Sequence, residues 1–323
     1  EDLALAVDLV ADLVRNPTFP DEEIALLKGQ VQNSLKQAEN DTGAVAHRNF
    51  RERCYPVGHA YRLRPQGYLP TLELIGPAEL RAAHAASFGV EGAVIVASGD
   101  VVFEHFIDVL EASFGSWTDR GAAAVVVEAV PPPSASRYDA TIDGKTQSDL
   151  IVGAPCISRT HPDFQAARLA NLIFGRLGMM GRLGESVREA MGLAYGISSD
   201  LDAGLGAGPW TIRAGVNPTN VEAALDGIRD QLARLHRDGV TDDEFDRARR
   251  FSTGSVALQL ESNDGIASTI SDVILHDLGL DFIDRYPGII GELTIDEVNR
   301  AAREHFPNFD DLVVSVCGPP LGP

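Results

Sequence analysis

The segments IGPAELRAAHAASF (75–88) and LTIDEVNRAAREHF (293–306) align without a gap, and this internal match sets the expected architecture of the chain. Their offset is 293 − 75 = 218 residues. Upstream, FPDEEIALLK (19–28) matches VTDDEFDRAR (240–249) at a similar offset of 240 − 19 = 221 residues. Matches in the same order at a nearly constant offset indicate a structural duplication.

Periodicity predicts the elements around these matches. Apolar residues recur at helical spacing in 21–39 and 161–175, and Thr241-x-x-Glu244 and Thr294-x-x-Glu297 are capping boxes that open helices. Apolar runs predict strands at 93–99, 138–143, 148–155, 195–201, 209–216 and 312–318. This mixture predicts an α+β fold of two homologous α/β sandwich domains, each an antiparallel-type sheet with helices packed on one face.

The two copies differ in length. The second copy has about 85 residues, roughly 136–220, before its first matched helix, whereas the first copy has none. We therefore expect a first domain that is truncated at its N-terminus. The expected division is the C-terminal part of the first domain at 1–117, a Pro/Ala-rich linker with three consecutive prolines at 118–137, and a complete second domain at 138–323.

Composition excludes some classes of function. Lys and Arg number 27 against 47 Asp and Glu, a net charge of −20, which argues against nucleic-acid binding because nothing would neutralise the phosphates. The three cysteines form no C-x-x-C pair, and no apolar run is long enough to span a bilayer. None of the eight histidines lies in an H-x-x-E-H or similar zinc motif, so each is expected to be a solvated or capping residue.

The segment GRLGESVREAMGLAYG (181–196) carries the candidate chemistry. Arg188 and Tyr195 are strong hydrogen-bond donors on either side of the turn-forming Gly192, at a junction between helix and strand. Two such donors can converge on a developing oxyanion. Taken alone, the spacing is more typical of a surface ion pair followed by an ordinary strand aromatic.

With the duplication and this segment together, the chain resembles the pitrilysin/insulinase-type zinc metallopeptidase family over essentially its whole length, especially its small bacterial and mitochondrial processing peptidase-like members. The matching stretches are NPTFPDEEIALLKGQ (16–30), GHAYRLRPQG (58–67) and GRLGESVREAMGLAYGISS (181–199). In that family, one domain holds zinc through H-x-x-E-H and a distal glutamate, and another domain supplies an Arg/Tyr pair to the same centre.

The resemblance implies that Arg188 and Tyr195 are that pair. Tyr195 would donate to the tetrahedral intermediate or substrate carbonyl, and Arg188 would support it or orient the peptide. The family's distal zinc glutamate matches the helix at 21–39, where the corresponding positions are Leu27 and Ser34. We therefore expect no metal ligand set and no cofactor on this chain, with zinc held by a partner chain or by a part of the protein ahead of Glu1.

Three functions stay open at this stage. The first is a subunit of a zinc metalloendopeptidase that is inactive alone and supplies Arg188 and Tyr195 to a zinc-bearing homologue in a heterodimer, or to a second copy in a homodimer. The second is a self-sufficient zinc peptidase that has been shortened, and the third is a non-catalytic peptide-binding or structural homologue. Extended peptides are the expected substrate, and the sequence does not choose between bacterial cytoplasm and periplasm.

Overall fold

The computed structural model describes residues 2–121 and 126–320, so residues 122–125 of the predicted linker lie outside the described residues. The chain divides into two compact units. The first takes in the described residues of Glu1–Leu35, Gln66–Val125 and Gln259–Leu275, and the second those of Lys36–Pro65, Val126–Leu258 and His276–Pro323. These two units are defined by the contacts within each of them. The predicted domains, separated by a linker at 118–137, were defined by the internal duplication of the sequence, and they stay a prediction.

The first unit consists of helices that bury few apolar side chains. Its helices are α1 (Leu3–Arg15), most of α2 (Asp21–Glu39), α4 (Leu69–Glu73), α5 (Pro77–Ser87), α6 (Phe103–Phe114) and α10 (Asn263–Leu275). Polar contacts connect them: Arg15 donates to Ser116 Oγ at 2.8 Å, and Lys28 donates to the carbonyl of Ile75 at 2.6 Å.

The predicted strand at 93–99 is wrong, because the structure shows irregular backbone over these residues. A strand is stable only when a neighbour satisfies its backbone groups. Among the described residues, no strand pairs with this segment, so its apolar pattern has no sheet to join.

The second unit contains a five-stranded sheet in the order β1-β5-β2-β4-β3. β5 runs antiparallel to β2, β2 to β4 and β4 to β3, while β1 pairs parallel with β5. Every strand predicted between 138 and 318 is present, with the bounds β1 (Ser136–Thr141), β2 (Ser148–Pro155), β3 (Ala194–Leu201), β4 (Pro209–Val216) and β5 (Val313–Gly318).

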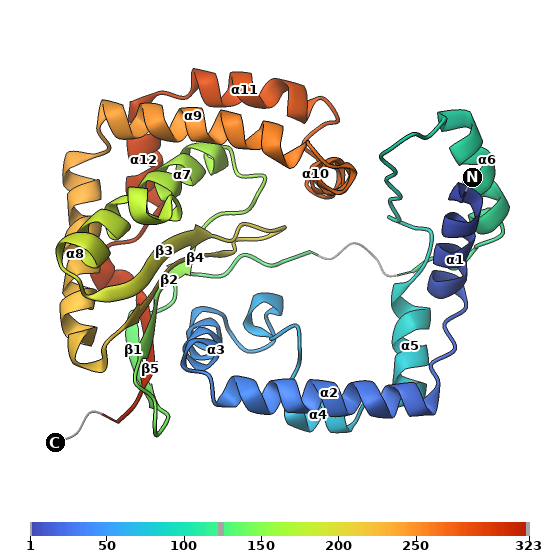
Figure 1. Ribbon diagram of the computed structural model, residues 1–323, viewed down its shortest axis with the longest axis horizontal. Helices are drawn as coiled ribbons and strands as arrows, with labels where there is room; N and C mark the ends of the chain where they lie inside the picture. The colour runs from blue at the N-terminus through green and yellow to red at the C-terminus, as the bar shows by residue number, and fades with distance from the viewer. Residues whose placement is uncertain (1, 122–125, 321–323) are drawn as a thin grey trace. The chain divides into compact units, whose positions relative to one another are not determined.

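One face of this sheet is covered by helices, as predicted. α7 (Phe164–Asn171), α8 (Val221–Asp238) and α12 (Ile295–His305) share a buried apolar cluster with the strands, and Figure 1 shows α8 and α12 on one side of the sheet. At its centre Trp210 of β4 stacks on Phe306 with ring centroids 4.4 Å apart. Two further helices of this unit are α9 (Asp242–Gln259) and α11 (Phe282–Glu292).

The opposite face is covered as well, by α3 (Thr42–Cys54), which comes from far upstream in the chain. Its buried Ala46 and Phe50 join Ile151, Val313 and Cys317 in a second apolar cluster. Neighbouring residues on a strand face opposite sides of a sheet, which is why Ile151 lies in this cluster and its neighbours Leu150 and Val152 lie in the other.

Both predicted capping boxes are confirmed. The Thr241 N–H donates to Glu244 Oε2 at 2.8 Å, and the Thr294 N–H donates to Glu297 Oε2 at 2.8 Å. In the other copy, the Gly76 N–H donates to Glu79 Oε2 at 2.9 Å at the position that aligns with Thr294. The mixed α/β architecture with helices on a sheet is therefore confirmed. No helix among the described residues has the length and apolar character to cross a membrane.

Candidate functional site

Arg188 lies on a short helical segment that is followed by a turn at Gly192. The segment η4 (Gly184–Ala190) is π-helical, a conformation that is rare and occurs often at functional sites. The Leu193 N–H donates to the Val187 carbonyl at 3.0 Å, which closes the turn. Gly192 has a φ of 64°, so the predicted turn residue adopts the backbone region that glycine tolerates best.

Tyr195 lies at an irregularity in β3, the strand at one edge of the sheet. Ala194 pairs with Val216 and Gly196 pairs with Gly215, so Tyr195 is the additional residue of a β-bulge. The bulge breaks the alternation of the strand: Ala194 and Ile197 are buried, whereas Tyr195 and Gly196 are both exposed. Bulges redirect side chains and are common beside active sites.

Both candidate side chains are available to a ligand. Arg188 is exposed, and Tyr195 has a relative exposure of 65%. Across the described ranges, neither side chain has a hydrogen bond, ion pair or ring contact, and the structure does not bring the two into contact with each other. The turn at Gly192 places Arg188 and Tyr195 on either side of one helix-to-strand junction. Among the described residues, neither the guanidinium nor the phenol O–H donates a hydrogen bond.

A polar anchor holds the start of this segment. The Arg182 guanidinium donates to both Glu244 oxygens at 2.6 Å and to the Gly239 carbonyl at 2.7 Å. Burial alone would raise the pKa of Glu244, but hydrogen bonds from Arg182 and Thr241 bring that pKa below its ordinary value. The segment that carries Arg188 is thereby attached to the first turn of α9.

The positions that match the family's distal zinc glutamate do not form a metal site. Leu27 and Ser34 lie two turns apart on α2, and both are exposed. Leucine has no ligand atom, and serine is a poor zinc ligand compared with carboxylate, imidazole or thiolate. Since the sequence also has no H-x-x-E-H, the residues of this chain do not fit the zinc centre that the resemblance implies.

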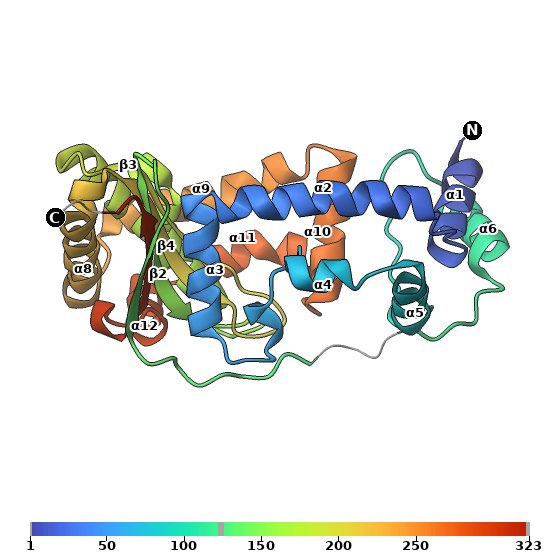
Figure 2. The same ribbon diagram turned by 90° about the horizontal axis from the view of Figure 1, so that it is seen from below.

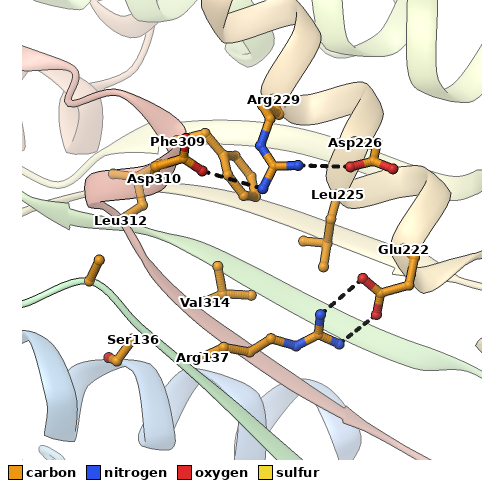
Figure 3. A pocket seen from close by; sticks show the side chains of 11 residues that line it. Ser136, Arg137, Glu222, Leu225, Asp226, Arg229, Phe309, Asp310, Leu312 and Val314 are labelled. Carbon is orange, nitrogen blue, oxygen red and sulfur yellow. Dashed lines mark hydrogen bonds and ion pairs between the residues drawn. The ribbon is translucent and has the colours of Figure 1, made fainter.

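A hollow of about 310 Å³ lies beside β1, at the other end of the strand order from β3 (Figure 3). Its two arginines already have acidic partners: Arg137 donates to Glu222 at 2.7 Å, and Arg229 donates to Asp226 at 2.8 Å. These ion pairs leave no free cation for an anionic ligand, and the hollow contains neither Arg188 nor Tyr195.

Sequence reasoning missed one group of side chains that could hold a metal. His161, Asp163 and His305 offer ligand atoms within 4.8 Å of one another, and theirs is the one such group among the residues that the structure describes. The motif His-Pro-Asp at 161–163 was visible, but nothing in the sequence brings His305 next to it.

Comparison with known proteins agrees with this architecture. Residues 75–251, more than half of the chain, match the family described as "Peptidase M16 inactive domain". The crystal structure of a peptidase M16 inactive domain from Pseudomonas fluorescens has a TM-score of 0.91 and 27% identity to this chain, with 98% of this chain and 75% of that chain covered.

Two curated relatives are similar over most of the chain. A Streptomyces coelicolor protein named an uncharacterized zinc protease is 27% identical over 330 residues, which cover 98% of this chain and 70% of that protein. The mitochondrial-processing peptidase subunit beta of Pongo abelii is 21% identical over 287 residues, which cover 85% of this chain and 57% of that protein.

Proposed function

We propose that this chain, which belongs to the peptidase M16 inactive-domain family, takes part in proteolysis through Arg188 and Tyr195. Membership of that family confirms the resemblance to pitrilysin-like peptidases. In this proposal the pair stabilises the substrate carbonyl during cleavage of an extended peptide. The observation that carries it is the bulge that exposes Tyr195 on an edge strand, across the turn from Arg188, whose guanidinium has no partner among the described residues.

Tyr195 suits the role of an oxyanion donor. A phenol O–H donates one hydrogen bond and stays neutral at physiological pH, so it stabilises charge that develops on a carbonyl oxygen without competing for a proton. A side chain that is already hydrogen-bonded would first have to break that bond. Tyr195 has no such bond among the described residues, so its donor is ready.

Arg188 suits the role of a second donor or a peptide clamp. A guanidinium presents several N–H groups in a fixed plane, which suits a carbonyl or carboxylate of a bound peptide. The buried Val187 beside it packs against α8, and Arg182 anchors the same segment to Glu244. A rigid base reduces the conformational entropy that the exposed guanidinium loses when it binds.

In this proposal, zinc is held by residues that the given sequence does not contain. The relatives are named zinc proteases, yet Leu27 and Ser34 stand at the matched ligand positions here. We therefore propose a homologous zinc-bearing subunit as the partner, in a heterodimer. The name of the relative from Pongo abelii, a "subunit beta", supports an assembly of several chains.

A reconstitution assay tests the proposal. The purified chain is mixed with a zinc-bearing homologue, and cleavage of a quenched fluorescent peptide is followed. We expect no cleavage by the chain alone and cleavage by the mixture. Tyr195→Phe removes one donor and should lower kcat about 100-fold with little change in KM, since a donor used in the transition state affects turnover more than binding.

The matched control is Tyr138→Phe, because Tyr138 is another exposed tyrosine on an edge strand, on β1 at the other side of the sheet. It should leave kcat unchanged. An unchanged kcat in Tyr195→Phe, with cleavage by the mixture intact, would contradict the proposed role.

A second candidate function is capture of extended peptides without catalysis. β3 ends the strand order, and no described strand pairs with its outer edge, so a peptide could add to it by backbone hydrogen bonds. The same mixing assay separates the two functions. Peptide binding with no cleavage under any pairing would favour capture alone.

A further inference from the structure

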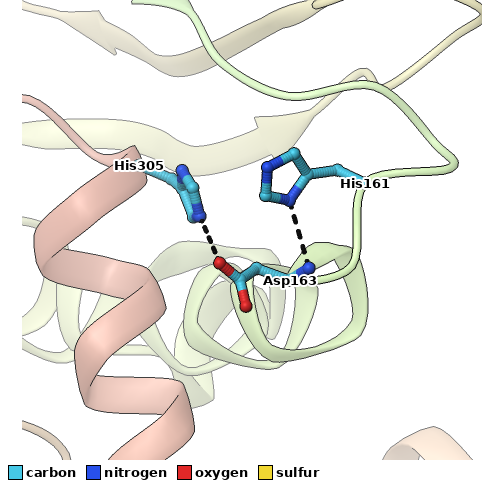
Figure 4. Close-up of side chains that lie close together, drawn as sticks. All are labelled: His161, Asp163 and His305. Carbon is cyan, nitrogen blue, oxygen red and sulfur yellow. Dashed lines mark hydrogen bonds and ion pairs between the residues drawn. The ribbon is translucent and has the colours of Figure 1, made fainter.

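A second group of side chains, outside the candidate site, lies where the start of α7 meets the end of α12: His161, Asp163 and His305. His161 and Asp163 lie in the loop that leads into α7, and His305 is the last residue of α12. Figure 4 shows the three side chains turned toward one another. Two imidazoles and a carboxylate are a frequent ligand set for zinc and other divalent transition metals.

The distances between their atoms suit a shared ion. His305 Nε2 lies 2.9 Å from Asp163 Oδ2, and the His161 and His305 rings have their centroids 4.9 Å apart. Two ligand atoms that are each about 2.1 Å from Zn²⁺ stand about 3 to 3.4 Å apart. Small side-chain rotations therefore bring three ligand atoms to one ion, without a change in the backbone.

The carboxylate is already held in place by a second layer of contacts. Arg300 donates to Asp163 Oδ1 at 2.6 Å and to Oδ2 at 3.0 Å, and it also donates to Glu304 at 2.9 Å. Because the Glu304 carboxylate also pairs with the Arg300 guanidinium, the two carboxylates together carry one more charge than Arg300, and this excess can attract a cation. Second-layer partners of this kind orient metal-ligating carboxylates.

Burial favours binding but leaves an entry path. The side chains of Asp163 and His305 have relative exposures of 17% and 15%, so an ion would be partly shielded from water and still reachable. Three protein ligands leave a coordination position for water.

Metal binding must replace two existing hydrogen bonds. His305 Nε2 is bonded to Asp163, and the Asp163 N–H donates to His161 Nδ1 at 3.1 Å. Binding through both Nε2 atoms needs each ring proton on Nδ1, so both of these hydrogen bonds are given up. In Figure 4 the His161 nitrogen that is not bonded to Asp163 faces His305, on the side where the ion would lie.

We infer that His161, Asp163 and His305 form a binding site for a divalent transition-metal ion of the Zn²⁺ class, which ties the start of α7 to the end of α12. The inference does not depend on the role of Arg188 and Tyr195. Because only the folded state brings the three ligands together, such an ion would raise the free energy of unfolding and hold the two helices against each other.

The test is a metal titration of the full chain after treatment with a chelator. Co²⁺ is added first, because its visible absorption reports the ligand field, and Zn²⁺ is then added to displace it. We expect saturation at a single ion per chain, and affinity about tenfold or more weaker in His161→Gln and in His305→Gln. Zn²⁺ should raise the Tm of the wild type and not that of these variants.

The control is His105→Gln, because His105 is an exposed histidine on α6 in the other compact unit. It should bind Co²⁺ as the wild type does. His161→Gln keeps the Arg300–Asp163–His305 contacts, so it tests binding even if His305→Gln fails to fold. No saturable binding by the wild type, or equal binding by folded His161→Gln, would overturn the inference and leave an ion-pair network only.

Discussion

The Arg182–Glu244 ion pair should contribute more to stability than an exposed helix cap does, and the chain contains its own comparison. Glu244 and Glu297 occupy the same position of two capping boxes, and each accepts from the N–H of a threonine at 2.8 Å. Only Glu244 also accepts two hydrogen bonds from Arg182, where the side-chain exposures are 14% and 17%. Glu244→Ala and Glu297→Ala therefore differ by that ion pair.

The expected magnitudes follow from these contacts. Glu297→Ala removes the hydrogen bonds that the Glu297 carboxylate accepts from Thr294 and leaves the Thr294 cap in place, so its whole expected effect is about 1 kcal/mol. Glu244→Ala also leaves the Arg182 guanidinium without its carboxylate, and two charge-assisted hydrogen bonds at this partial exposure add about 2 kcal/mol. The free energy of unfolding should therefore fall by about 3 kcal/mol in Glu244→Ala.

Urea denaturation followed by Trp210 fluorescence measures the difference. Trp210 is fully buried in the unit that contains both glutamates, and a Trp117→Phe background removes the only other tryptophan. With an m value of about 2 kcal/mol/M, the midpoints should fall by about 1.5 M for Glu244→Ala and about 0.5 M for Glu297→Ala.

Equal midpoints for the two variants would refute the reasoning, because they would mean that the Arg182 contacts contribute nothing. Arg182→Met provides the second arm of a double-mutant cycle with Glu244→Ala. The coupling free energy between these two changes should be about 2 kcal/mol.

Three further substitutions have defined outcomes. Gly153→Ala would place a Cβ 2.1 Å from the Trp210 carbonyl oxygen of the paired strand, so thermal melting should show a loss of about 2 kcal/mol or more. Asn171→Leu removes the acceptor of the buried Trp210 indole N–H, now bonded at 2.9 Å, and urea denaturation should show a loss of about 2 kcal/mol. Hydrogen bonds from Arg300, and secondarily from His305, lower the pKa of Asp163 in the folded state. The contribution of Asp163 to the free energy of unfolding is therefore full above its unfolded pKa of about 4 and is lost as the pH falls below that value. In a plot of Tm against pH, Asp163→Asn should show a smaller loss of Tm on the acid side than the wild type.

Local patterns in the sequence were sufficient for much of this fold. Capping boxes depend on residues three apart, and strand alternation depends on residues two apart, so both could be read without tertiary information. The segment 93–99 shows the limit of that approach. Its apolar pattern predicts a strand, but a strand exists only where a neighbour pairs with it.

The candidate site was predictable in its residue types and not in its geometry. Arg188, Gly192 and Tyr195 stand in one short segment, so the sequence alone placed two donors beside a turn. The β-bulge at Tyr195 depends on how β3 pairs with β4, which no local pattern reports. His305 lies 142 residues from Asp163, so their contact required the packing of α12 against α7.

The position of α3 has a consequence for how the chain is made. A ribosome completes α3 long before it reaches β5, which supplies Val313 and Cys317 of the cluster that buries Phe50. Until β5 is made, the cluster around this helix lacks Val313 and Cys317, so part of its apolar surface stays exposed, and chaperones bind exposed apolar surface of this kind. Closure of this layer therefore awaits β5, and the layer should acquire its native packing only after that strand has been synthesised.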